Sequence, residues 1–193
     1  MHSVFSHNTY LLKRQVLALT GKVRVYTPMG QLGLYSEQKM FKLREDIRVY
    51  ADENKLNELL WIQARQIIDF AAAYDVFDQT SGMKVGALRR KGWRSIMRDT
   101  WEILDPMDTV IGIVREDSAG RALLRRFVLG SLLPQRYDVV QGNEQVIAHF
   151  YQRFHLFRYE LDIDFSMNTA ALDRRLGLAT GILLAMLEGK QQS

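Results

Sequence analysis

A short basic stretch holds the residues of this chain that are best suited to a chemical task. Between Lys84 and Arg98 it carries six Lys or Arg residues and one Trp. Clustered positive charge favours partners with anionic groups, such as lipid headgroups or nucleic acid. A tryptophan among cations can insert at a membrane interface while the cations meet phosphates. The alternative is a solvated turn that aids solubility, with the indole folded onto the protein. The candidate headgroup-binding residues are Arg89, Arg90, Lys91, Trp93, Arg94 and Arg98.

Two further groups of cations follow: Arg121 with Arg125 and Arg126, and Arg174 with Arg175. The second group opens a predicted helix, where positive charge opposes the helix dipole. We therefore expect carboxylates to hold these two arginines, and the candidates are Asp162, Asp164 and Glu102.

The remaining polar residues predict no enzyme. His149 and His155 lie six residues apart without a third ligand at metal spacing, so we expect a structural or exposed pair. No Ser lies in a G-x-S-x-G context, and neither a phosphate-binding loop nor a dinucleotide fingerprint occurs. Paired carboxylates are expected at the surface: Glu45 with Asp46, Glu116 with Asp117, and Asp162 with Asp164. The prediction is that the chain has no catalytic residue, no metal and no cofactor.

The composition bounds the class of protein. The chain has 193 residues, of which 47% are apolar and 25% charged, and a net charge of +4. These values are typical of one globular domain, predicted here over residues 1–193. No Cys is present, and the first residues form no hydrophobic signal region. We expect a cytoplasmic protein, peripheral at the membrane if the basic stretch binds lipid, with His2 and His7 in a mobile tail.

Alternation of apolar and polar residues with period two recurs along the chain and predicts half-buried antiparallel strands. In RYELDIDF, residues 158–165, the apolar and aromatic side chains share one face and the charged ones the other. Turn residues separate such runs at Met29-Gly30, Asp52-Glu53-Asn54, Thr80-Ser81-Gly82, Pro106-Met107-Asp108 and Gln141-Gly142-Asn143. The twelve expected strands are 10–13, 22–28, 32–39, 46–51, 57–65, 70–77, 83–91, 99–105, 109–116, 136–141, 145–152 and 157–165.

Two segments predict helices. Ser118 can cap the first, which Gly130 and Pro134 end. The second runs from Leu172 to Leu187 and is apolar on all sides from residue 176, so it must be buried. Its uncharged part is far shorter than the roughly 20 residues that span a bilayer. Gly177, Gly181 and Ala185 form a smooth stripe that allows close approach of a strand wall. Together these features predict a mainly β fold: a twelve-stranded antiparallel closed β-barrel that encloses the hydrophobic helix.

Twelve strands followed by a hydrophobic helix resemble the tubby C-terminal-like superfamily, and most closely its bacterial LURP-one-related (scramblase-like) group. The segments that carry the resemblance are FKLREDIRVYADE (41–53), IQARQIIDFAAAYDVFD (62–78), VGALRRKGWRSIMRDTWEILD (85–105) and the final LDIDF with LDRRLGLATGILLAMLEG. The resemblance implies the enclosed-helix barrel and, as in some tubby members, phosphoinositide binding through basic surface residues. The sequence lacks the Cys-rich and Pro-rich segments of the scramblases, which argues against scramblase activity.

Three functions follow as hypotheses. The first is a non-enzymatic barrel that binds an anionic phospholipid or another ligand on its basic face. The second is a protein-binding or regulatory domain with no lipid role, whose protein partner is unknown. The third is nucleic-acid binding. Its only support is charge, so a nucleic-acid partner is not expected. The sequence leaves the oligomeric state open.

Overall fold

The computed structural model describes residues 1–15, 20–39, 46–65, 73–91, 100–116, 135–153, 155, 158–167 and 172–187. It contains twelve strands: β1 (Thr9–Gln15), β2 (Thr20–Tyr26), β3 (Leu32–Lys39), β4 (Asp46–Tyr50), β5 (Glu58–Ala64), β6 (Ala73–Asp78), β7 (Met83–Lys91), β8 (Thr100–Leu104), β9 (Val110–Glu116), β10 (Arg136–Gln141), β11 (Gln145–Arg153) and β12 (Arg158–Asp164). Each strand overlaps one of the twelve predicted ranges. The predicted helix that begins at Ser118 lies outside the described residues.

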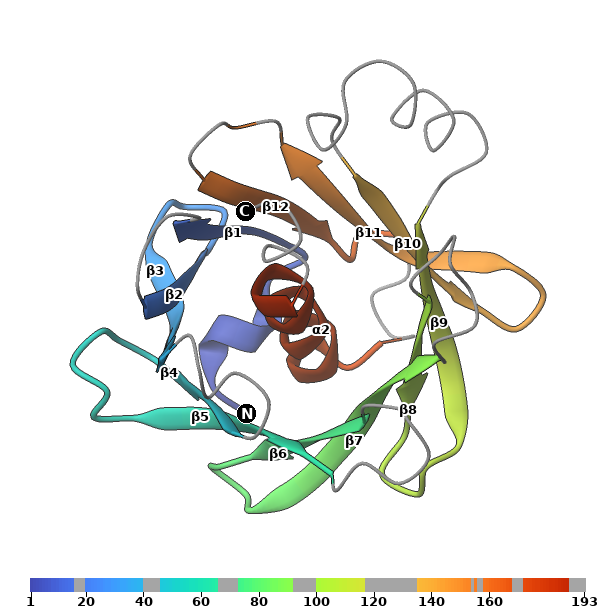
Figure 1. Cartoon of the computed structure of the whole chain (residues 1–193), viewed down its shortest axis with the longest axis horizontal. Helices are drawn as coiled ribbons and strands as arrows, with labels where there is room; N and C mark the ends of the chain where they lie inside the picture. Colours follow the sequence, from blue (N-terminus) through green and yellow to red (C-terminus); the bar gives the residue numbers. More distant parts are fainter. Residues whose placement is uncertain are drawn as a thin grey trace.

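The strands form a closed antiparallel barrel (Figure 1). Each strand pairs with its neighbours in sequence, and β1 closes the ring by pairing with β12 from Thr9↔Asp164 to Gln15↔Arg158. Burial alternates as predicted, for example in β4, where Ile47 and Val49 are buried. The predicted twelve-stranded closed barrel is therefore confirmed.

The barrel has two different ends. Short turns join the strands pairwise at one end, which we call the hairpin end; they comprise residues 27–31, 51–57, 79–82, 105–109 and 142–144. The first four contain all of the predicted turn residues and the fifth contains Gly142 and Asn143, whereas Gln141 ends β10; Gly30, Gly82 and Gly142 have the positive φ that glycine accommodates without strain. The other end, where β1, β3, β5, β7, β9 and β11 terminate, we call the loop end.

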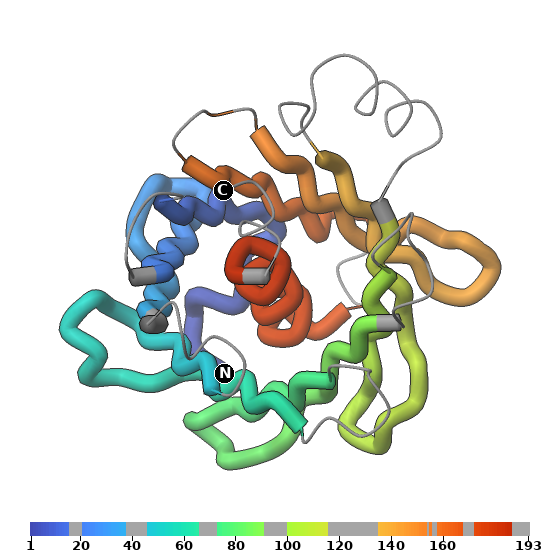
Figure 2. The backbone as a smooth tube through the Cα atoms, in the orientation of Figure 1, coloured from blue at the N-terminus to red at the C-terminus, as the bar shows by residue number. Residues whose placement is uncertain are grey.

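Helix α2 (Arg174–Leu187) lies inside the ring of strands (Figure 2). It enters at the hairpin end, where Arg174 donates hydrogen bonds to the His7 carbonyl and the Asn8 side chain just before β1. It ends at the loop end, where Arg14 of β1 donates to the Ala185 carbonyl over 2.7 Å. Every side chain from residue 176 to 186 is buried. The larger apolar ones each stabilise the fold by roughly 1.5–3 kcal/mol before entropy is subtracted.

The smooth stripe of α2 faces the barrel wall as predicted. A Cβ on Gly181 would lie 2.6 Å from Ile163 Cδ1 of β12, and one on Gly177 would lie 2.5 Å from Cε1 of the Phe165 ring. Such distances are shorter than real carbon contacts, so a larger residue at either position would require the neighbouring side chain to shift. The glycines set the position of α2 in the lumen.

The prediction of a mobile N-terminal tail is wrong. Residues Ser3–Ser6 form a 3-10 turn, η1, whose Val4 N–H donates to the His2 ring. Val4 and Phe5 are buried, and the Tyr10 hydroxyl donates to the Val4 carbonyl over 2.7 Å. Two apolar residues are too few to show a period, so the sequence pattern does not reveal this segment.

Candidate functional site

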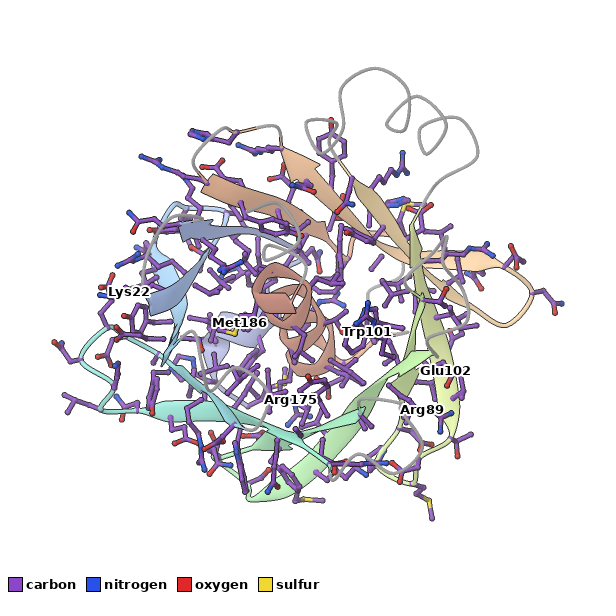
Figure 3. All side chains as sticks on the ribbon, viewed as in Figure 1. Lys22, Arg89, Trp101, Glu102, Arg175 and Met186 are labelled. Atoms are coloured by element: carbon purple, nitrogen blue, oxygen red, sulfur yellow. The ribbon has the colours of Figure 1, made fainter. Side chains whose placement is uncertain are left out.

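Two residues of the predicted basic site, Arg89 and Arg90, do not share a face. Arg89 and Arg90 are neighbours on β7 and therefore point to opposite sides of the barrel wall. Arg89 points outward, and its Nε donates to Glu102 Oε2 over 2.8 Å (Figure 3). The Glu102 side chain is only 5% exposed, so this arginine balances a buried carboxylate. Of the remaining predicted residues, Lys91 ends β7, while Trp93, Arg94 and Arg98 lie outside the described residues.

Arg90 shares the inner face of β7 with buried Leu88 and lies opposite Trp101 of β8. The Trp101 side chain points into the barrel (Figure 3) and is 3% exposed. Its indole Nε1 is buried without a hydrogen-bond partner among the described residues. The end of β7 therefore brings a cation and an unused donor to the lumen at the loop end.

Arg14 is the second cation on the inner face at the loop end. It shares this face with Tyr10 and Leu12 and is 3% exposed. Within the described part of the chain, the Ala185 carbonyl is its one hydrogen-bond partner. Burial lowers the pKa of Arg14, and the nearby Tyr159 hydroxyl opposes that shift. Arg14 lies just beyond the predicted strand 10–13, so the alternation did not assign it to the inner face.

Several cations on the outer wall, in contrast, are held by carboxylates. Three arginines use the edge formed by Nε and Nη2 to hold both oxygens of one carboxylate: Arg24 with Glu53, Arg65 with Asp75, and Arg153 with Asp162. Lys84 lies 3.0 Å from Asp75 and 2.8 Å from Asp108. The Arg24–Glu53 and Lys84–Asp108 pairs hold acidic hairpin turns against the barrel wall. Because these cations face carboxylates, the charge of the outer wall is close to neutral.

The hairpin turns and the loop-end connections differ in charge. The five hairpin turns carry five Asp or Glu residues and one Lys. Between the strand ends at the loop end, the segments outside the described residues carry seven Lys or Arg and four Asp or Glu. These segments are 16–19, 40–45, 66–72, 92–99, 117–134, 154 and 156–157. They account for +3 of the net charge of +4. Most of the excess positive charge is therefore in the sequence that connects one strand to the next at the loop end.

The arginines that open α2 have partners other than the predicted ones. Arg175 donates to both oxygens of Asp173 and to Asp78, while Arg174 stacks on the Phe165 ring with its guanidinium carbon 4.6 Å from the centroid. Burial of Asp78 opposes its ionisation, but the Thr80 N–H and Arg175 outweigh this effect and hold the pKa of the carboxyl below its usual value. The expectation of Asp162, Asp164 or Glu102 as partners is wrong, because Asp162 and Glu102 face outward toward Arg153 and Arg89.

The prediction of a structural or exposed histidine pair is confirmed. His149 Nδ1 lies 2.6 Å from Asp138 Oδ1 and 3.2 Å from Arg136 Nη2 on the outer wall. His155 is exposed. Among the described residues, no three His, Asp or Glu side chains gather as a metal site would require.

A pocket of about 390 Å³ lies at the hairpin end beside the first turn of α2. Its lining includes Val85, Ile111 and Leu176, with Arg175 and Lys84 at its charged part. Met83, another lining residue, is 68% exposed. Exposed methionine beside an apolar pocket is typical of adaptable protein-binding surfaces.

No family model, curated protein or solved structure matches the chain. Within the described residues, no helix has the length and apolarity needed to cross a membrane.

Proposed function

We propose that this chain is a non-enzymatic, tubby-like barrel that binds anionic phospholipid at its loop end. The assignment to the tubby C-terminal-like superfamily is supported by the order of twelve strands and one enclosed hydrophobic helix. The lipid role is supported by charge. The outer-wall cations Arg24, Arg65 and Arg153 are paired with carboxylates, whereas Arg14 at the loop end has no carboxylate partner among the described residues, and the sequence between the loop-end strand termini carries the excess charge.

The separation of charge is the observation that carries the proposal. A cation that is already paired with a carboxylate binds phosphate weakly, because the existing ion pair must first be broken. Cations without such partners attract anionic surfaces over roughly the Debye length, about 10 Å at 0.1 M salt. Each one near an anionic bilayer contributes about 1 kcal/mol. The loop end is therefore the part of the molecule best suited to an anionic membrane.

Vesicle flotation tests the proposal. The unaltered protein should float with phosphatidylserine-containing vesicles but not with phosphatidylcholine vesicles, and less so at about 500 mM than at about 50 mM salt. The triple variant Lys91→Gln, Arg94→Gln, Arg98→Gln should lose flotation. Arg89 is kept, because its removal would take a paired cation away from the buried Glu102 carboxylate.

The matched control removes the same charge from the outer wall through Lys13→Gln, Lys22→Gln and Lys55→Gln. These lysine side chains are 36–41% exposed and paired with Glu160 or Glu37. The control should float like the unaltered protein. Equal loss in both triple variants would mean that only net charge matters, and the loop-end site would be refuted.

A protein partner is the second candidate, favoured by the apolar pocket beside Met83 and Leu176 at the hairpin end. The same flotation experiment separates the two candidates. If the unaltered protein does not associate with anionic vesicles at either salt concentration, the lipid proposal is wrong and the protein-binding role takes its place. Retention of the protein by duplex DNA without flotation would instead assign the charge to nucleic acid.

A further inference from the structure

The buried guanidinium of Arg14 is incompletely satisfied. Its Nη1 donates to the Ala185 carbonyl over 2.7 Å, while Nε is buried without a partner. No carboxylate among the described residues pairs with it, in contrast to Arg24, Arg65 and Arg153 on the outer wall. Those three arginines each hold an oxyanion on the Nε and Nη2 edge. In Arg14 that edge has no partner among the described residues.

Burial of an incompletely hydrogen-bonded guanidinium costs free energy. An arginine does not lose its proton within a protein, so it cannot escape the cost of burial by becoming neutral. A buried charge ordinarily requires a counter-charge or full hydrogen bonding. The carbonyls that end α2 supply about half an elementary charge of opposite sign. The rest of the charge and the Nε donor still lack compensation.

The inner face around Arg14 changes character along the barrel. Toward the hairpin end, β1, β12 and β11 present Tyr10, Ile163 and Phe150, which are buried and packed around the Phe165 ring or beside it. Toward the loop end, the same three strands present Arg14, Tyr159 and Gln152. The Gln152 Oε1 atom is also buried without a hydrogen-bond partner among the described residues. Arg14 Nε and Gln152 Oε1 are thus an unused donor and an unused acceptor on the loop-end part of the same three strands, and unused buried polar groups call for a bound polar partner.

We propose that Arg14 binds one phosphate group at the loop end of the lumen, through the Nε and Nη2 edge of its guanidinium. This inference rests on the proposed function, since it names the residue that receives the headgroup phosphate. The two parallel N–H donors of this edge match two oxygens of a phosphate, which a lysine cannot reproduce. A lipid headgroup and free phosphate share this chemistry, and the experiment distinguishes them.

Thermal unfolding with inorganic phosphate, compared with NaCl at equal ionic strength, is the first measurement. Phosphate should raise the melting temperature of the unaltered protein and of Arg153→Lys, an arginine paired with Asp162 on the outer wall. In Arg14→Lys the phosphate-dependent rise should disappear, or require about tenfold more phosphate. An equal rise in Arg14→Lys and in the unaltered protein would overturn the proposal.

Should Arg14→Lys fail to fold, nuclear magnetic resonance of the unaltered protein decides. With ¹⁵N-labelled arginine, saturable phosphate addition should shift one Nε–H signal, with one phosphate bound per chain. Absence of a shift in every such signal would overturn the proposal.

Glu188, the first residue after α2 and outside the described residues, provides a further test. If Glu188→Gln destabilises the protein as much as Arg14→Lys and the double variant loses nothing more, an internal carboxylate is the counter-ion and the proposal is wrong.

Flotation then separates this inference from the proposed function. If the unaltered protein floats and Arg14→Lys floats less, the Arg14 site and the lipid role are both supported, and the lipid is the source of the phosphate. Equal flotation of both proteins without a phosphate-dependent rise refutes the Arg14 site alone. A phosphate-dependent rise that needs Arg14, without any flotation, refutes the lipid role and assigns the site to free phosphate.

Discussion

Replacement of Gly177 by Ala should destabilise the protein, against the usual preference for Ala in helices. The added Cβ would lie 2.5 and 2.6 Å from Cε1 and Cζ of Phe165 and 3.2 Å from Leu172 Cδ2. The Phe165 ring is fully buried between Tyr10, Phe150 and the guanidinium of Arg174, so it has no room to retreat. Overpacking costs about 1–3 kcal/mol, whereas Ala gains at most about 1 kcal/mol in helix propensity. Because the ring cannot retreat, we expect a cost in the upper part of this range, about 2–3 kcal/mol, and a net loss of about 1–2 kcal/mol.

Gly181→Ala is the matched comparison on the same stripe. Its Cβ would meet Ile163 Cδ1 at 2.6 Å, the far end of a side chain that can change rotamer. Here the propensity gain should offset the smaller clash and leave stability close to unchanged. For a chain of this size, thermal unfolding followed by circular dichroism should place Gly177→Ala about 2–8 °C below Gly181→Ala. A Gly177→Ala variant as stable as the unaltered protein would refute the close packing of α2 on Phe165.

Three further predictions concern burial and charge. Arg89→Ala should lower the free energy of unfolding in urea by about 1–3 kcal/mol, because it removes the cation that pairs with the buried Glu102 carboxylate; the double variant with Glu102→Gln should recover part of this loss, and no recovery would contradict the pairing. Asp78→Asn should destabilise the protein at pH 7. Since the folded pKa of Asp78 lies below its unfolded value near 3.9, this difference should shrink as the pH falls below about 4, and a pH-independent difference would contradict it. Deletion of residues 176–187 should give insoluble or unfolded protein, and a soluble, cooperatively unfolding product would contradict the enclosed helix.

Period-two alternation predicted the twelve strands because the barrel has one apolar and one solvated face along its whole circumference. Turn residues predicted the hairpin end because Gly30, Gly82 and Gly142 adopt positive φ locally, without help from distant residues. The enclosed helix followed from its lack of a polar side. These features depend only on neighbours in sequence, so local reasoning was sufficient.

The candidate site was harder to predict, because its partners are distant in sequence. Arg175 pairs with Asp78, 97 residues away, and no local pattern connects them. Arg14 was missed because the alternation of β1 was read only as far as residue 13. For Arg89 and Arg90 the signal was present: adjacent strand residues face opposite sides, and the cluster of charge obscured this rule.

Because β1 pairs with β12, the ring of strands can close only after nearly all of the chain has been synthesised. Helix α2 is made later still, yet it must lie inside, so closure has to wait for it. The Arg14–Ala185 contact joins residues 171 positions apart. Until then, the nascent chain exposes the unpaired edge of β1 and the apolar face of every strand, and such edges invite aggregation. We therefore expect folding to be post-translational and slow, and yield in the cell to depend on chaperones that shield the open sheet.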